Sequence, residues 1–269
     1  MHKVTRILAV GAGFVILSGC NFQNRFLYHP GEETIADVRQ YAAENHLQMW
    51  PDSNPGYRGI VSQKGPAFFK GTVIVFHGNA GPAASRKHYF APLEDRGYRV
   101  VLAEYPGYGG RSGEMSENSF VYDARQTAAR ARQEFGGPLY VWGESLGCGI
   151  ASGVATDETI RPKGVVMLTP WDSLRNEAKA KFPWLPVSLF LSDKYDNVVN
   201  LAKYRGPVAV IMAGKDEVIP NRLTKRLYDS LSRPKRMWLF ENAGHNNWPA
   251  DPALGWWDEV MKFVERSQD

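Results

Sequence analysis

The sequence predicts a single α/β domain in which a mostly parallel central sheet carries helices on both faces. Three observations lead to this prediction. The chain has 269 residues, 43% of them hydrophobic, which is enough to bury one large core. From about residue 70 onward, short runs rich in β-branched residues alternate with segments of helical periodicity. These runs are mostly apolar and do not alternate with polar residues, as in parallel strands that are covered on both faces.

Six segments have the composition of buried strands and recur along the chain with helical patterns between them. They are residues 72–76, 98–103, 139–142, 164–168, 208–212 and 236–240. Upstream of them, residues 46–50 and 57–62 are predicted to form an antiparallel hairpin at the edge of the sheet.

The helices between these strands are predicted from apolar residues that recur every three or four positions. One helical face consists of Val121, Ala124, Ala128, Ala131 and Phe135, and it ends at Gly136 and Gly137. A second face consists of Leu223, Leu227 and Leu231, behind Pro220. The last helix is expected to open at Asp251 and Pro252 and to turn Leu254, Trp257, Met261 and Val264 inward.

Residues 171–205 differ from the other connections in the chain. They lie between the last-but-two and last-but-one strands and carry Pro183 and Pro186 within an apolar run that includes Phe182 and Trp184. We interpret them as a short lid-like insertion over the site. The alternative is a loop and helix crossover that packs on the sheet.

Residues 1–19 are predicted to be a signal peptide, because a basic start is followed by an apolar run at 7–17 and then by small residues. The apolar run is too short to span a bilayer. The stretch Leu-Ser-Gly-Cys that ends at Cys20 resembles the lipobox of bacterial lipoproteins. That resemblance implies that Cys20 carries lipid, with residues 20–35 as a lipid-anchored tether and residues 36–269 as the folded domain.

Asn21 follows the position of the lipid. In Gram-negative lipoproteins an aspartate at this position favours the inner membrane, so by resemblance the asparagine implies the outer membrane, with the domain facing the periplasm. The alternatives are an ordinary signal peptide or a tail anchor in which Cys20 has no role. Cys148 is the other cysteine of the chain, so a lipid on Cys20 would leave no intramolecular disulfide.

The charge balance argues against a nucleic-acid partner. The formal net charge is +4, and removal of Lys3 and Arg6 with the signal leaves thirty basic against twenty-eight acidic side chains, or +2. No group of His, Cys and Glu residues has the spacing of a metal site, so no metal is predicted. A basic run at 222–236 is interpreted as a solvated helix face, with a patch that faces an anionic membrane as the alternative.

The sequence Gly143-Glu-Ser145-Leu-Gly147 lies between the predicted strand 139–142 and a run of small residues with helical pattern. A serine at the tip of a tight strand-to-helix turn needs glycine on both sides, because any other side chain would collide with the strand or the helix. Ser145 is therefore the predicted nucleophile. The adjacent Glu144 is expected to point away from it.

A serine nucleophile needs a base and an acid that orients the base, and on this kind of sheet they follow in the order Ser, acid, His. His245 follows the last predicted strand and Asp216 follows the one before, so both are expected at the carboxyl edge of the sheet with Ser145. Asp172, which follows strand 164–168, is the rival acid.

The same chemistry needs two N–H donors for a developing oxyanion. The first is predicted to be the backbone amide of Leu146, directly after the nucleophile. The second is expected from the glycine-containing loop after strand 72–76, where the Asn79 amide is the best candidate and Ala80 the next.

These motifs together resemble the α/β-hydrolase superfamily, from about residue 45 to the C-terminus, and in particular its small-lidded, serine-aminopeptidase-like branch. The stretches that carry the resemblance are 77–81, 104–110, 143–147, 214–216 and 244–245. The resemblance implies a serine hydrolase that requires no cofactor and acts on a small-molecule acyl ester or thioester. A peptidase of the aminopeptidase type and a non-catalytic lipoprotein binding module on the same fold are the alternatives.

Overall fold

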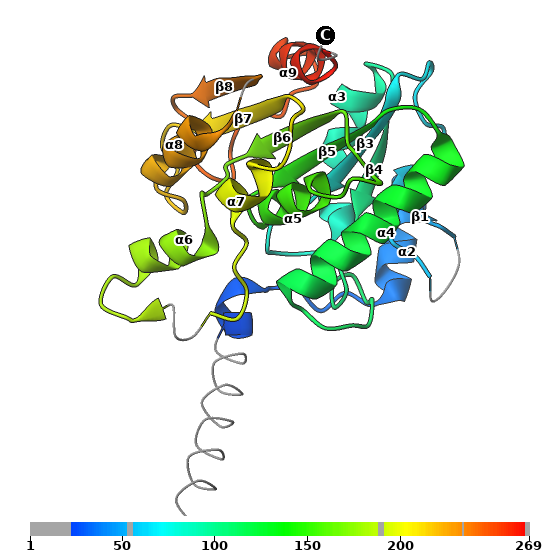
Figure 1. The fold of residues 1–269 in the computed structure, drawn as a ribbon. Helices are drawn as coiled ribbons and strands as arrows, with labels where there is room; N and C mark the ends of the chain where they lie inside the picture. The colour runs from blue at the N-terminus through cyan, green and yellow to red at the C-terminus, as the bar shows by residue number, and fades with distance from the viewer. Residues whose placement is uncertain (1–22, 53–55, 188–190, 233, 267–269) are drawn as a thin grey trace, which may run out of the picture.

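A central eight-stranded sheet organises the part of the chain that the computed structural model describes, which is residues 23–52, 56–187, 191–232 and 234–266 (Figure 1). The strands lie in the order β1-β2-β4-β3-β5-β6-β7-β8. The predicted signal peptide, Cys20 and Asn21 lie outside the described residues.

The predicted strands are confirmed. Their bounds are β1 Leu47–Trp50, β2 Gly59–Ser62, β3 Gly71–Phe76, β4 Tyr98–Ala103, β5 Leu139–Glu144, β6 Gly164–Leu168, β7 Val208–Ala213 and β8 Lys235–Phe240. The first two form the predicted antiparallel hairpin at the edge, and β2 also runs antiparallel to β4. From β4 to β8 every pairing is parallel. Parallel strands share one carboxyl edge, so residues that follow β3, β5, β7 and β8 can meet there.

Helices cover both faces of the sheet, as predicted. The helical bounds are α2 Ile35–Glu44, a 3-10 helix Ala83–Tyr89, α3 Phe90–Glu94, α4 Glu117–Phe135, α5 Leu146–Ala155, α6 Leu174–Lys181, α7 Asn197–Leu201, α8 Asn221–Ser230 and α9 Trp256–Val264. Buried residues of α4, α5, α7 and α8 form one core with one face of the sheet. Those of α2, α3 and α9 form a second core with the opposite face.

The last helix begins later than predicted. It starts at Trp256, because the side chain of Asp251 accepts a hydrogen bond from the Ala253 amide at 2.9 Å and so closes a turn instead of capping a helix. Leu254, expected inside, is 37% exposed, whereas Trp257 is buried, as expected. The Asp251-Pro252 sequence, which predicted a helix cap, thus forms a turn before the helix.

The described part of the predicted tether packs against the domain. Residues 23–27 are helical, and Gln23 and Tyr28 are buried. Both donate hydrogen bonds to the carboxylate of Asp193. The polar side chains at the two ends of this short helix therefore fix it to the chain segment that follows α6.

No helix in the described part of the chain is both long and apolar enough to cross a membrane.

Candidate active site

Ser145 lies in the turn between β5 and α5, with φ at 53° and ψ at −114°. Positive φ is unfavourable for a residue other than glycine. The turn is tight enough that a Cβ atom at Gly147 would collide with the carbonyl oxygen of Phe76, and one at Gly143 would collide with the backbone of Cys148. The two glycines are thus present for the steric reason that the sequence suggested.

Three side chains from the turns and loops that follow β5, β7 and β8 meet at the carboxyl edge of the sheet. His245 Nε2 lies 2.9 Å from the Oγ of Ser145. His245 Nδ1 lies 2.8 Å from Oδ2 of Asp216 and 3.0 Å from its Oδ1. All three side chains are buried or nearly so. The serine hydroxyl can donate to Nε2 while the protonated Nδ1 donates to the carboxylate, which is the geometry that removes the serine proton during attack.

Backbone amides hold the Asp216 carboxylate in place. Its Oδ1 accepts hydrogen bonds from the amides of Val218 at 2.9 Å and Ile219 at 2.7 Å. The loop after β8 is tied to the same turn, because the His245 amide donates to the carboxylate of Glu217 at 3.0 Å. The base and the acid are therefore fixed to one another by contacts outside their own pair.

The rival acid has other partners. Asp172 accepts hydrogen bonds from the Asn176 side chain at 2.6 Å and the Ser173 amide at 2.7 Å, and Arg226 approaches to 3.4 Å. These contacts place its carboxylate at the start of α6. Of the two acids, Asp216 is the one in contact with the histidine.

Glu144 points away from Ser145, as expected. One carboxylate oxygen pairs with Arg86 at 3.1 Å and the other accepts from the Tyr89 hydroxyl at 3.2 Å. Burial alone would raise the pKa of Glu144, but Arg86 and His88 outweigh it and hold the pKa below its ordinary value. This pair ties the 3-10 helix to the turn that carries the nucleophile.

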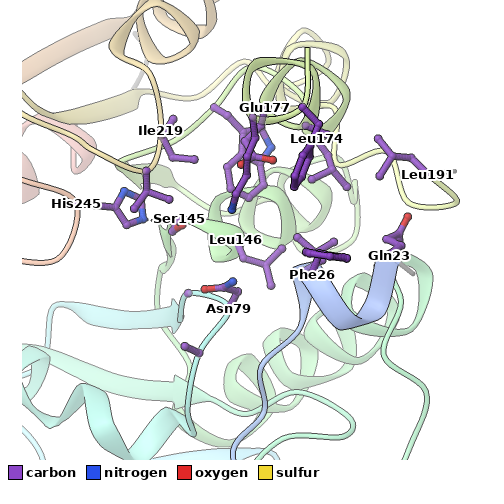
Figure 2. A pocket seen from close by; sticks show the side chains of 18 of the residues that line it. Gln23, Phe26, Asn79, Ser145, Leu146, Leu174, Glu177, Leu191, Ile219 and His245 are labelled. Atoms are coloured by element: carbon purple, nitrogen blue, oxygen red, sulfur yellow. Dashed lines mark hydrogen bonds between the residues drawn. The ribbon is translucent and has the colours of Figure 1, made fainter. Parts of the chain in front are cut away.

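The predicted oxyanion donors face the same cavity as Ser145. Leu146 and Asn79 both line it, from α5 and from the loop after β3 (Figure 2). Among the described residues, neither backbone amide donates a hydrogen bond to the carbonyl of a loop or helix cap. The Asn79 N–H shares its peptide group with the Gly78 carbonyl, whose oxygen lies 2.7 Å from Nδ1 of His77. The next carbonyl, that of Asn79, accepts from the His29 amide and the Tyr108 hydroxyl, each at 2.9 Å.

A buried polar pair supports this loop from below. His77 Nε2 lies 3.1 Å from Oε1 of Glu104, and the other oxygen of Glu104 accepts from the Ala83 amide at 2.9 Å. Neither His77 nor Glu104 was predicted to have a role of its own. The available signal was a histidine and a carboxylate that each directly follow a predicted strand.

The cavity beside Ser145 has a volume of about 230 Å³ and is lined mainly by apolar side chains (Figure 2). Its walls include Phe26 and Leu27 from the N-terminal helix, and Leu174, Phe182 and Leu185 from α6 and the turn after it. The segment 171–205 therefore borders the site, as a lid-like insertion would. The wall from residues 23–27 was not predicted.

Charged groups interrupt this apolar lining. Glu177 on α6 faces the cavity, and burial raises its pKa, although Lys181 and His245 act in the opposite direction. Lys181 and Arg86 line the cavity as well. In the described residues, no three His, Cys, Asp or Glu side chains are grouped so as to hold a metal ion.

Comparisons with known proteins agree with this architecture. The family model for the alpha/beta hydrolase fold matches residues 71–198. An uncharacterised protein of Mycobacterium tuberculosis is 34% identical, over 93% of this chain and 89% of that protein. Lysophosphatidylserine lipase ABHD12 of Rattus norvegicus is 28% identical, over 76% of this chain and 53% of the lipase. This chain thus spans about half the length of that relative.

Solved structures show the same fold at low sequence identity. An esterase of Pyrococcus furiosus superposes with a TM-score of 0.61 at 18% identity, over 77% of this chain and 84% of the esterase. A monoacylglycerol lipase of Paleococcus ferrophilus superposes with a TM-score of 0.55 at 17% identity, over 75% of this chain and 96% of the lipase.

Proposed function

This chain belongs to the α/β-hydrolase fold family, and from that premise we propose that it is a serine hydrolase that cleaves carboxylic esters or thioesters through an acyl-enzyme on Ser145. The observation that carries the proposal is the hydrogen-bonded chain from Ser145 Oγ through His245 to Asp216, with distances of 2.9 and 2.8 Å. Ser145, at one end of this hydrogen-bonded chain, lines an apolar cavity. An activated hydroxyl next to a cavity suited to an acyl group is the arrangement that acyl transfer requires.

In the proposed reaction, His245 takes the proton of the Ser145 hydroxyl as Oγ attacks the carbonyl carbon of the substrate. Asp216 holds the imidazole in the required orientation and stabilises its protonated form. The tetrahedral intermediate collapses as His245 gives its proton to the departing alcohol or thiol. Water, deprotonated by the same histidine, then attacks the acyl-enzyme. The bond between the acyl carbon and Ser145 Oγ breaks, His245 returns the proton to Oγ, and the carboxylic acid is released.

The amides of Leu146 and Asn79 are proposed to bind the oxyanion of both tetrahedral intermediates. Such donors act where charge develops, and the loss of one typically lowers the rate by about 10² to 10³-fold. Leu146 and Asn79 border the cavity, and among the described residues neither backbone amide donates to a loop or cap carbonyl, which supports these roles.

Short to medium acyl groups are proposed as the preferred acyl part. The cavity of about 230 Å³ is small for a lipid-sized ligand but accommodates a modest hydrocarbon chain among Phe26, Leu174 and Phe182. The solved relatives with esterase and lipase activity in their names are consistent with ester cleavage.

The test uses Ser145→Ala beside the natural protein. Labelling by a fluorophosphonate probe and hydrolysis of p-nitrophenyl esters of rising chain length are measured, together with an acyl thioester and an aminoacyl arylamide. Loss of the nucleophile should reduce turnover by up to about 10⁶-fold. Ester turnover by a correctly folded Ser145→Ala protein would overturn the mechanism, and preferential cleavage of the arylamide would point to a peptidase.

We further propose that Cys20 carries the lipid that anchors the enzyme to a bacterial outer membrane on the periplasmic side, after removal of residues 1–19. The lipobox-like sequence and Asn21 support this localisation. Mass spectrometry of the mature N-terminus tests it. An unmodified Cys20 in the membrane fraction would contradict the proposal.

A further inference from the structure

We propose that the mouth of the active-site cavity docks onto an anionic phospholipid bilayer, so that this enzyme receives its acyl substrates from a membrane surface. The docking face consists of helix 23–27, α6 and residues 182–187. The inference rests on the proposed function, because it concerns access to the same cavity. Four observations support it: a fixed N-terminal helix, a short distance to Cys20, exposed apolar side chains and basic side chains.

The N-terminal helix is held in a fixed place beside the cavity. Gln23 Nε2 and the Tyr28 hydroxyl each donate to Oδ2 of Asp193 at 2.5 Å, and Gln23 Oε1 accepts from the Ser192 amide at 2.8 Å. Tyr28 also contacts the Tyr195 hydroxyl at 2.9 Å. These bonds are buried, so the helix is part of the cavity wall and not a loosely attached linker.

This attachment limits how far the cavity can be from the start of the mature chain. Cys20 precedes Gln23 by three residues, which reach at most about 11 Å when fully extended. A lipid on Cys20 would therefore hold the cavity wall against the bilayer surface. A long flexible linker would have imposed no such limit.

Two large apolar side chains are exposed on this face. Phe26 is 49% exposed and packs edge-to-face on Phe182, with ring centroids 6.0 Å apart. Trp184, in the turn after α6, is 79% exposed. Phe26 and Phe182 also line the cavity, so the exposed apolar side chains are continuous with the lining of the site. Tryptophan and phenylalanine favour the interface between water and lipid.

Basic side chains are exposed on the same segments as these aromatics. Arg25 on the N-terminal helix and Arg175, Lys179 and Lys181 on α6 are exposed, with Glu177 as the acidic residue of that helix. Basic residues close to an anionic surface each contribute about 1 kcal/mol to attachment. The combination of exposed aromatics and basic residues is typical of surfaces that bind anionic lipid.

The basic run at 222–236 provides no comparable face. Arg226 pairs with Asp172 and Arg236 pairs with Glu259, at 3.4 and 2.7 Å. Lys235 donates to backbone carbonyls of α8. Arg222 and Lys225 of this run are exposed as well, but its described residues include no exposed aromatic side chain. Of the two basic regions, the docking face is therefore the one that combines basic residues with exposed aromatics.

The experiment places an environment-sensitive fluorophore at the docking face. In the full chain with Cys20→Ser, the label is attached through Trp184→Cys, or through Tyr122→Cys on α4 as the matched control, since Tyr122 is 68% exposed. Cys148 is buried and does not compete for the label. On vesicles of phosphatidylethanolamine and phosphatidylglycerol, the label at position 184 should shift to the blue and be quenched by spin-labelled lipid, whereas the label at 122 should not.

Charge is tested in the same protein. Arg175→Gln with Lys179→Gln should weaken binding to these vesicles by about 25-fold, the product of about fivefold for each side chain. The control pair Lys64→Gln with Lys203→Gln, exposed residues outside the docking face, should leave binding unchanged. Failure of the protein to bind, or binding with both fluorophores in water, overturns the proposal.

Activity and docking are separated by repeating the measurements with Ser145→Ala. Insertion of the label at position 184 should be unchanged in that protein, because docking does not require the nucleophile. If the label at position 184 inserts into the vesicles but the protein with Ser145 hydrolyses no ester, the proposed hydrolysis alone is overturned. An active enzyme that hydrolyses soluble esters without inserting position 184 would overturn the docking alone.

Discussion

At the scale of single residues, Ser145 occupies its turn in a strained backbone conformation. A φ of 53° with ψ of −114° costs a residue other than glycine about 1 to 3 kcal/mol. The hydrogen bond of 2.9 Å from its amide to the Leu168 carbonyl helps to hold this conformation. The flanking glycines made the turn predictable from sequence, because they are needed wherever a serine occupies it. The oxyanion donors were harder to identify, because any residue has an amide.

The acid of the site is the first residue-level prediction. Asp216→Asn should lower kcat for soluble esters by about 10³ to 10⁴-fold with little change in stability, because an amide can no longer hold the histidine in the orientation needed for proton transfer. Asp172→Asn is the matched variant, since it alters a carboxylate that contacts Asn176 and Ser173 instead of His245. Its kcat should stay within about twofold.

Steady-state kinetics on p-nitrophenyl esters, with circular dichroism to check folding, measure both variants. A larger loss of kcat in Asp172→Asn than in Asp216→Asn would reverse the assignment of the acid.

At the scale of secondary-structure elements, most of the sheet was predictable because β3, β5, β6 and β7 are buried on both faces and therefore almost uniformly apolar. Strands β4 and β6 match their predicted bounds, and β7 extends by one residue to Ala213. The start of α9 was not predictable from Asp251 and Pro252, because the same capping residues also close turns. The helix begins at Trp256, after that turn, and both Trp256 and Trp257 are buried.

The ion pair between the 3-10 helix and the β5–α5 turn should make stability depend on pH. With Arg86 present the pKa of Glu144 is below its ordinary value, so its contribution to stability is complete above about 4.5 and is lost as the pH falls through the lowered value. In Arg86→Met, burial would instead raise the pKa of Glu144. That variant would then lose stability as the pH rises through about 4.5.

The free energy of unfolding of Arg86→Met should therefore fall short of the natural value by about 3 to 5 kcal/mol at about pH 7, and by less at about pH 3.5. Urea unfolding at the two pH values measures the difference. Arg39→Met is the control, since Arg39 pairs with Asp52 on the exposed surface and should change stability by at most about 0.5 kcal/mol at either pH. An Arg86→Met deficit that is equal at both pH values would contradict the prediction.

At the scale of the whole molecule, the chain brings its N-terminal part to the segment after α6 (Figure 1). The contact between Gln23 and Asp193 joins residues 170 positions apart. No sequence pattern around Gln23 or Asp193 indicates this contact. Residues 20–35 were therefore predicted from sequence as a tether. The pairing forms only in the folded domain, where Asp193, in the segment after α6, lies beside residues 23–28.

The Tyr28 hydroxyl should be important for holding the N-terminal helix against the segment after α6. Burial, together with Tyr195 and Asp193, raises the pKa of Tyr28, so its hydroxyl keeps its proton and donates to the Asp193 carboxylate. Tyr28→Phe should lower the free energy of unfolding by about 1.5 to 3 kcal/mol, as expected for a hydrogen bond to a charged group. Because helix 23–27 lines the cavity, its loosening should also raise KM for longer p-nitrophenyl esters more than for the acetate.

Urea unfolding and the chain-length series measure these two effects, with Tyr122→Phe as the control, because that exposed hydroxyl should contribute at most about 0.5 kcal/mol. A Tyr28→Phe protein with natural stability and an unchanged chain-length profile would mean that the N-terminal helix neither closes the fold nor shapes the site. A loss of stability with an unchanged profile would confine its role to the fold, since the cavity wall would then be held by Phe26 and Leu27 without the contact to Asp193.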